Sequence, residues 1–330
     1  FNDALKEHYT DEAVMNEVYK DNPLMALLSK SEEFGGRNYP IPLIYGNPQG
    51  RSATFANAQT RGLATSSLID AFLLTRVKDY SIATIDGETL KASIGNQNAF
   101  MEAATTEIDG AINALSRSIA IKQYGDGFGS IGQVSAPSAS TTLTLVNPQD
   151  VTNFEVNQVV VFSSTSGASL LRVGSLTVTG VNRSAGTLTM SANVNSIASI
   201  ANNDFIFIQG DRQDSATPTA ICISGLEAWI PAATPSATTF FGVNRTVDAT
   251  RLAGQRLNGV GTPIEELLID GAVNVGREGG KLTHYFMPYI TYGNLEKSLG
   301  SKVQYVDLKV NAEVGFRGIM INGPRGPVNC

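Results

Sequence analysis

Three glycines in the stretch "GFGSIG", Gly127, Gly129 and Gly132, spell G-x-G-x-x-G, the pattern by which dinucleotide-binding folds bring backbone close to a pyrophosphate. That chemistry needs a strand before the glycines and a helix after them, because the helix N-terminus supplies the positive end of its dipole. Here a helical pattern precedes the glycines and a Ser/Thr-rich extended stretch follows. We therefore interpret "GDGFGSIG", residues 125–132, as a helix C-cap and hinge, not a phosphate site.

Residues for nucleophilic or metal chemistry are scarce. Histidine occurs only at His8 and His284, and we expect His284, in "LTHYFMPY", to be a strand side chain with a structural hydrogen bond. That leaves too few partners for a Ser–His–Asp or Cys–His arrangement or for a zinc site. "GREGGKL" lacks the spacing and the Ser or Thr of a phosphate loop. The sequence predicts no catalytic, cofactor-binding or metal-binding residues and no enzyme.

The composition indicates a folded protein with a low charge content. The chain has 330 residues, enough for two or three modules, with 16% charged residues and a net charge of −6. Lysine is absent from Gln123 to Gly280, which disfavours a basic groove for nucleic acid. Two cysteines, Cys222 and Cys330, cannot form a disulfide framework. No apolar run is long enough for a membrane span, so we expect a soluble protein made in a reducing cytoplasm.

The first third of the chain predicts an arm and a ribbon. Residues 1–30 carry a broken amphipathic pattern that "DNPL" ends, with too few apolar residues for a core of their own. Pro40 and Pro42 are tolerated only on an edge strand, and "LIDAFLLTRVKDYSIATI" alternates as a long strand with one face formed by Phe72, Leu74, Arg76, Lys78, Tyr80 and Ile82. Together they predict a long two-stranded ribbon, which is marginal in water unless another surface holds it.

A long helix is predicted from 98 to 123, about 40 Å in length. Apolar residues recur within one arc at Leu90, Ile94, Met101, Ile108, Ile112, Leu115 and Ile119. We expect Glu102, Thr106, Asn113 and Arg117 to face away from that arc.

Residues 133–210 predict a small β-barrel or sandwich. Five short alternating stretches recur there: "TTLTLV", "NQVVVFSS", "SLTVTGV", "GTLTMS" and "DFIFIQ". "NRSAG", between the third and fourth, predicts a hairpin turn.

An α/β module is predicted after a linker. "TAICISGLEAWI" reads as a strand and turn, and "TPIEELLIDGAVNVG" as a helix with Thr262 as its N-cap and Pro263 at its first position. "HYFMPY" is expected as a strand, "NLEKSLG" as a short helix, and "VQYVDLKVNAEVGFRGIMING" as a pair of strands.

The order of these parts resembles the major capsid protein of tailed bacteriophages, the Hong Kong 97 type fold. Local stretches are similar to that family: "NPLMALLSK", "YPIPLIYGNPQGRSATFANAQ", "AFMEAATTEIDGAINALSRSIAIKQYGDGFGSIG" and "GFRGIMINGPRGPVN". The resemblance covers most of the chain outside 133–210. Members of the family usually continue past the "GPRGPV" stretch with strands that return to the peripheral domain, whereas this sequence stops at Cys330.

The resemblance implies an α+β architecture in five parts. These are an N-terminal arm over 1–35, an extended β-ribbon loop over 36–85, and a peripheral domain with a spine helix over 86–132. An inserted all-β domain over 133–210 and an axial domain with peripheral-domain strands over 211–330 complete the expected order.

The function implied is that of a major capsid protein, which assembles through pentamers and hexamers into an icosahedral head around double-stranded DNA. Expected partners are further copies of the chain, with scaffold, portal and decoration proteins, and DNA contacted only non-specifically; no cofactor or membrane is expected. The location implied is the virion, after assembly in the host bacterial cytoplasm. We expect intersubunit contacts at Arg51, Phe55, Arg76 and Lys78, which could otherwise be ordinary exposed loop residues.

Three other functions remain open at this point. Another virion part, such as a tail-tube or decoration protein, is disfavoured by the long helix and the order of modules. An oxidoreductase would have to use 127–132, and a titration with dinucleotides would test it. A carbohydrate-binding module at 133–210 would rest on few aromatic residues, Phe154, Phe162, Phe205 and Phe207, with Trp229 outside it.

Overall fold

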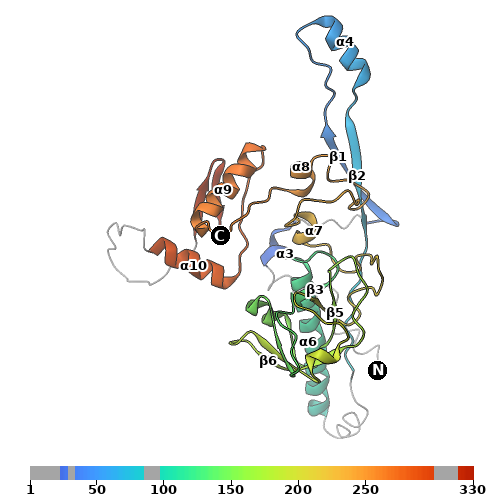
Figure 1. Cartoon of the computed structure of the whole chain (residues 1–330), viewed down its shortest axis with the longest axis vertical. Helices are drawn as coiled ribbons and strands as arrows, with labels where there is room; N and C mark the ends of the chain where they lie inside the picture. Colours follow the sequence, from blue (N-terminus) through green and yellow to red (C-terminus); the bar gives the residue numbers. More distant parts are fainter. Residues whose placement is uncertain (1–22, 29–33, 85–96, 301–318) are drawn as a thin grey trace. The chain divides into compact units, whose positions relative to one another are not determined.

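The computed structural model describes residues 23–28, 34–84, 97–300 and 319–330 (Figure 1). Its architecture is mixed α+β, as predicted. Contacts divide the chain into two compact units, one formed by Phe1–Pro231 with Thr239–Asn244, the other by Ala232–Thr238 with Arg245–Cys330. The five-part division proposed from the sequence stays a prediction.

The predicted ribbon is present in the first unit, but it is shorter than expected. Strand β1 (Asn38–Gly46) pairs antiparallel with β2 (Leu68–Thr75), and helix α4 (Phe55–Ala64) lies in the connection between them (Figure 1). Thr75 is the partner of Asn38, where β1 begins. Because a strand needs a partner, the prediction that β2 continues to Ile82 is wrong.

The two prolines of β1 occupy positions that need no ladder hydrogen bond. The backbone N–H of Leu73 points away from β1, because it donates to the carbonyl of Phe241 at 2.9 Å. In an antiparallel pair, two directly opposite residues point their backbone N–H and C=O groups either both toward each other or both away. Pro40 is opposite Leu73, so its backbone nitrogen also points away from the partner strand and no ladder hydrogen bond is lost there. Pro42 lies two residues further along β1, so its backbone nitrogen also points away from β2. The predicted edge placement of both prolines is confirmed.

The long helix is confirmed as α6 (Gln97–Lys122). The Arg117 guanidinium is partly buried and donates to Glu155 and to the carbonyl of Thr152. Among the other predicted positions, Leu90, Ile94 and the side chains of Met101, Glu102 and Thr106 lie outside the described residues.

The glycine motif ends α6, as predicted. Gly127 and Gly129 have φ of 92° and 82°, a region that favours glycine, and strand β3 (Ser130–Gln133) follows directly. A Cβ at Gly129 would lie 3.0 Å from the carbonyl oxygen of Asp211. A helix therefore precedes the motif and a strand follows it, the reverse of the order that binds a pyrophosphate. The hinge role stays a prediction.

A closed antiparallel barrel follows, built from strands in the order β3, β8, β5, β6, β7, β4. Beyond β3, their bounds are β4 (Thr142–Thr144), β5 (Val159–Ser163), β6 (Leu176–Asn182), β7 (Thr187–Met190) and β8 (Phe205–Ile208). A bridge between Val134 and Leu145 joins the two ends of this order, with Ser135 donating to Thr144 at 2.8 Å. All five predicted strands, the barrel and the hairpin between β6 and β7 are confirmed.

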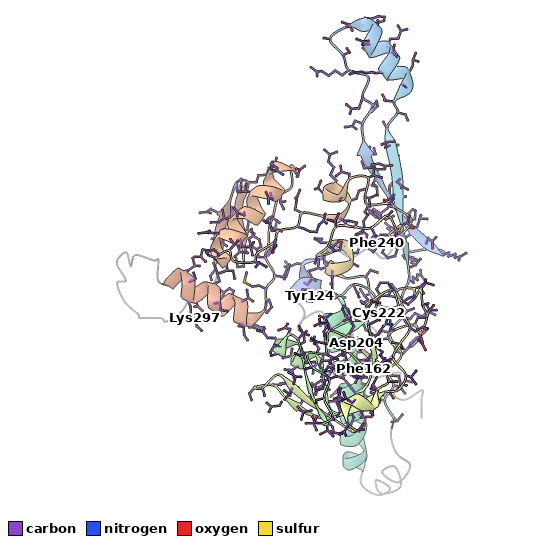
Figure 2. All side chains as sticks on the ribbon, in the orientation of Figure 1. Tyr124, Phe162, Asp204, Cys222, Phe240 and Lys297 are labelled. Carbon is purple, nitrogen blue, oxygen red and sulfur yellow. The ribbon has the colours of Figure 1, made fainter. Side chains whose placement is uncertain are left out.

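The barrel encloses the main hydrophobic core of the described residues. Its fully buried members include Phe154, Phe162 and Ile206, and Figure 2 shows Phe162 among the barrel strands. Two short 3-10 helices, η1 (Pro148–Asn153) and η2 (Val194–Ser196), add Val151 and Val194 to it. This part of the chain has the apolar interior to be stable in itself.

The second unit packs two helices and a hairpin. Helix α9 (Ile264–Arg277) contacts strand β9 (Met320–Gly323) and helix α10 (Tyr289–Gly300), and β9 pairs with β10 (Gly326–Asn329). A short helix α8 (Ala249–Ala253) precedes them. Ala272 and Leu295 are buried in this packing, and the Tyr285 hydroxyl donates to the Leu268 carbonyl at 2.5 Å.

Not all local predictions are confirmed. The helix that "DNPL" is predicted to end would lie within 1–22, outside the described residues; helix α3 (Pro23–Leu27) begins at Pro23, because proline suits a first helical turn. Residues 219–225 form no strand, since their backbone makes only an isolated bridge, Asp126 with Ser224, before helix α7 (Leu226–Trp229). His284 likewise makes only a single bridge, to Asn329.

The helix predictions of the second unit need smaller corrections. The N-cap position of α9 is Pro263, not Thr262, and α10 begins at Tyr289, before the predicted "NLEKSLG". Of the strand pair predicted over 303–323, residues 303–318 lie outside the described residues. Strand β9 is confirmed, and its partner is β10, in the stretch that the sequence left unassigned.

We predict that Phe162→Ala lowers the free energy of unfolding of the barrel by about 3–5 kcal/mol, because it leaves a cavity in a closed core. The denaturant dependence of amide hydrogen exchange in β5 and β8 measures this. Val173→Ala is the control, because Val173 is 79% exposed and should change the value by less than about 0.5 kcal/mol. Equal losses in the two variants would contradict the closed core.

Candidate functional site

The far end of the ribbon presents apolar side chains that nothing among the described residues covers. Helix α4 has no buried residue; Phe55 is 82% exposed and Leu63 is 85% exposed. The two are eight residues apart and share one side of the helix. On the strands of the ribbon, Ile44 and Ile69 are opposite one another, and both are exposed. Four large apolar side chains exposed at one end of the ribbon make it a candidate interaction surface.

This ribbon tip, which we define as residues 47–67 with α4 at its centre, is also purely cationic. Between Asn38 and Ile69 the charged residues are Arg51 and Arg61, with no carboxylate. A ten-residue helix is marginally stable in water without packing. The tip therefore has both the composition and the energetic need for a partner surface.

At its other end, the ribbon is held by aromatic packing. The Phe72 side chain is buried and lies edge-on to Trp229, with ring centroids 5.2 Å apart, and 6.3 Å from Phe240. Phe240 lies 5.0 Å from Trp229 and 4.6 Å from Phe241. These rings come from β2, α7 and the turn at 240–243, near the position labelled Phe240 in Figure 2. Aromatic pairs of this geometry add to the burial energy, so the ribbon is anchored at its base.

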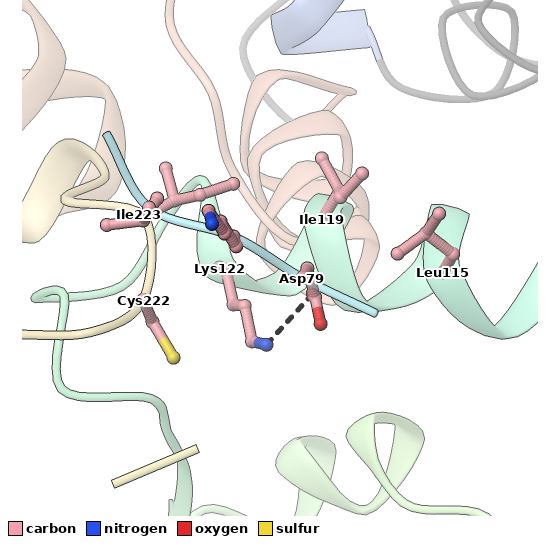
Figure 3. Close-up of a pocket in the computed structure, with 8 residues that line it drawn as sticks. Asp79, Leu115, Ile119, Lys122, Cys222 and Ile223 are labelled. Carbon is pink, nitrogen blue, oxygen red and sulfur yellow. Dashed lines mark hydrogen bonds and ion pairs between the residues drawn. The ribbon is translucent and has the colours of Figure 1, made fainter. Parts of the chain in front are cut away.

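A buried ion cluster fastens the segment that follows β2. The Lys122 ammonium lies 3.0 Å from Asp79 Oδ2 and 3.1 Å from Asp211 Oδ2, and the Ser118 hydroxyl donates to Asp79 at 2.7 Å. Lys122 is the last residue of α6 and its side chain is only 7% exposed. Figure 3 shows its link to Asp79. The cluster joins the segment after β2, the end of the long helix and the loop after the barrel.

The pKa values of the two carboxylates in this cluster are shifted in opposite directions. Burial acts to raise the pKa of Asp79, but hydrogen bonds from Ser118 and Lys122 outweigh it, so that pKa is lowered. Burial raises the pKa of Asp211, and the charge of Lys122 offsets only part of that effect. Burial acts to lower the pKa of Lys122, but Asp211 and Asp79 raise it on balance. Lys122 is thus held as a cation, which suits a structural clamp and not a general base.

A cavity of about 240 Å³ lies beside the cluster. It is lined by Val77, Lys78, Asp79, Leu115, Ile119, Lys122, Cys222 and Ile223, several of them labelled in Figure 3. Burial raises the pKa of the Cys222 thiol to about 11, so at neutral pH the sulfur is a poor nucleophile. The arrangement does not supply an activated group for covalent chemistry.

The described residues include no candidate metal cluster and no candidate membrane-spanning helix. Among them, no three His, Cys, Asp or Glu side chains gather closely enough to hold a metal ion. None of the helices in the described part of the chain combines the length and apolar character needed to cross a bilayer.

The four residues predicted as intersubunit contacts fall into two places. Arg51 and Phe55 lie together at the ribbon tip, both exposed. Arg76 and Lys78 follow β2 near its base, where the Arg76 guanidinium lies 4.3 Å from the centre of the Phe34 ring and donates to the Phe34 carbonyl. Lys78 is exposed at the edge of the cavity. The structure does not bring the two pairs together, and their intersubunit role stays a prediction.

The sequence reasoning missed three features of this region. Helix α4 had a signal in "FANAQTRGLA", whose alanines favour a helix and whose Phe55 and Leu63 share a side. The packing of Phe72, Trp229 and Phe240 left no local sequence signal, since these residues are far apart in the sequence. The Lys122 cluster also joins distant segments, although Lys122 is the last lysine before a long gap.

No protein-family model matches the chain, and no curated protein matches it significantly.

We predict that Lys122→Met lowers the free energy of unfolding by about 2–3 kcal/mol, because it leaves two half-buried carboxylates facing each other without a cation. This is less than for a fully buried pair, since Asp79 and Asp211 keep 26% and 20% exposure. Denaturant unfolding measures it. Lys78→Met removes an exposed lysine next to Asp79 and is the control; if it costs as much as Lys122→Met, the clamp is not specific.

We predict that Cys222 reacts slowly with iodoacetamide at pH 8 in the native protein and roughly 100-fold faster once unfolded, because its raised pKa depletes the thiolate. The measurement uses a Cys330→Ser background and mass spectrometry of the labelled peptide. Equal rates in native and denatured protein would show that Cys222 is not shielded as described.

Proposed function

We propose that the chain is the major capsid protein of a tailed bacteriophage, with the Hong Kong 97 type of fold. It assembles through pentamers and hexamers into an icosahedral head that encloses double-stranded DNA. The observation that carries the proposal is the ribbon, anchored by Phe72 at its base and uncovered at Phe55 and Leu63.

Every copy of the chain carries the exposed ribbon tip, so a partner that covers it must be present at one binding surface per copy. Further copies of the same chain meet that need. A tip that docks on a different surface of the next copy makes a heterologous contact, and such contacts close into rings when the rotation allows. The exposed ribbon edges, an aggregation hazard in a monomer, then become defined junctions.

Other features support the same proposal. The order of ribbon, long helix, inserted barrel and α/β unit agrees with the order expected from the resemblance. A net charge of −6 suits a container that must not bind its packaged DNA tightly. Scaffold, portal and decoration proteins are the further partners of this proposal, and the virion is the proposed location.

We predict that the purified protein assembles into closed particles visible by electron microscopy, and that a variant with residues 47–66 replaced by an Asn-Gly turn does not. The deletion removes α4 but keeps Phe72 and its aromatic neighbours. Circular dichroism and hydrogen exchange of the barrel check that the shortened chain is folded.

Two outcomes would contradict the proposal. One is wild-type protein that stays a monodisperse monomer at high concentration in sedimentation velocity. The other is a shortened variant that assembles as well as the wild type, because the ribbon tip would then contribute nothing to the particle.

A further inference from the structure

The cavity at the base of the ribbon has apolar walls and room for a small molecule. Its volume is about 240 Å³, and an apolar cavity of about 150 Å³ is large enough to hold benzene. The walls come from three separate segments: Val77 after β2, Leu115 and Ile119 on α6, and Ile223 before α7. Figure 3 shows Leu115, Ile119 and Ile223 around the cavity. The lining therefore suits an apolar body larger than benzene.

The polar groups at the buried end of the cavity are already paired with one another. The Lys122 ammonium lies between the carboxylates of Asp79 and Asp211. Asp79 also accepts a hydrogen bond from the Ser118 hydroxyl, and the Cys222 thiol donates to the backbone carbonyl of Asp211 at 3.2 Å. Because these groups satisfy each other within the fold, they offer little to the head group of a ligand.

Lys78 is the polar residue of the lining that has no such partner. Its side chain is exposed, and it makes no hydrogen bond or ion pair with any residue in the described part of the chain. Val77 beside it is 39% exposed, so the cavity opens to solvent at these two residues. An ammonium at the mouth of an apolar cavity favours a ligand that carries an anionic group.

The geometry points to a ligand class: we propose that this cavity binds a small amphiphile, an apolar chain that ends in a carboxylate. The chain fills the space between Val77, Ile119 and Ile223, and the carboxylate pairs with the Lys78 ammonium at the mouth. A single negative charge fits best, because Lys78 supplies one positive charge and the carboxylate of Asp79 is close by. The proposal does not depend on self-assembly.

Binding at this place has a structural consequence. A bound chain contacts α6 and the segment after β2 together, so we expect it to stabilise the base of the ribbon, because a ligand that binds only the folded chain raises its stability. Trp229 is the only tryptophan of the chain. It lines an adjoining cavity of about 180 Å³ that shares Val77 and Ile223 with the first, so its fluorescence reports on the filling of this region.

Titration of the full chain with octanoate tests the proposal, followed by thermal melting and by Trp229 fluorescence. We predict saturable binding that raises the melting temperature. Affinity should increase about fourfold for each methylene from hexanoate to octanoate, because each buried CH₂ contributes a similar free energy. Octylamine and octyl phosphate should bind more weakly than octanoate, since the first places a cation beside Lys78 and the second brings excess negative charge toward Asp79.

Substitutions separate the head group from the chain. Lys78→Met should weaken octanoate binding about three- to fivefold, the upper range for an exposed ion pair, and leave 1-octanol binding unchanged. Ile119→Trp, which fills the cavity, and Val77→Trp, which covers its mouth, should each abolish binding of both ligands. Lys297→Met removes an exposed lysine of α10 and is the control, with octanoate binding as in the wild type. Circular dichroism checks that each variant is folded.

Three results would overturn the proposal. The first is octanoate that shows no saturable binding to the wild type. The second is binding that survives Val77→Trp in a folded variant, because the ligand would then lie elsewhere. The third is an equal effect of Lys78→Met on octanoate and 1-octanol, which would show that Lys78 does not hold the head group. None of these results bears on the proposed capsid function.

Discussion

The aromatic packing of Phe72 against Trp229 and Phe240 anchors the ribbon at its base. The proposed function depends on the ribbon being held at this base while its far end stays uncovered. Leu73 adds a backbone hydrogen bond to Phe241 at the same level. Beyond it, the extensive contacts of β1 and β2 within the described part of the chain are with each other, and α4 has no buried side chain. Two strands and a ten-residue helix cannot offset their conformational entropy by themselves. The molecule thus has a rigidly rooted arm whose stability must come from outside the described fold.

The body that carries this arm is stabilised by two different means. The barrel closes its own edges and buries a contiguous apolar core, so it needs no partner. The junction of ribbon, long helix and barrel is instead held by the Lys122 cluster, in which one cation satisfies two carboxylates from distant segments. A polar clamp at a junction fixes geometry more than it adds stability. A stable barrel with a polar clamp at the base of the ribbon fits the proposed role of a shell subunit, in which the direction of the ribbon decides whether a ring of copies can close.

The sequence predicted most of the elements whose signal is local. Alternation in "NQVVVFSS" and "DFIFIQ" identified strands β5 and β8, helical spacing identified α6, and the turn in "NRSAG" identified a hairpin, because each pattern lies within one element. Elements that depend on partners were missed. The alternation from Phe72 to Ile82 continues past Thr75, but β1 supplies no partner there. Residues 219–225 alternate equally well and form no strand. The Lys122 cluster and the aromatic anchor join residues remote in sequence, which no local pattern can show.

The central claim is that sister copies, and not the chain itself, stabilise the ribbon tip. Amide hydrogen exchange of residues 54–65, compared between dilute monomer and assembled protein, tests it most directly, because exchange reports the opening of each hydrogen bond. The account predicts that these amides exchange almost freely in the monomer and become protected by orders of magnitude on assembly, while the barrel is protected equally in both. Equal protection of 54–65 in the two states would contradict it, because the tip would then be stable without a neighbour.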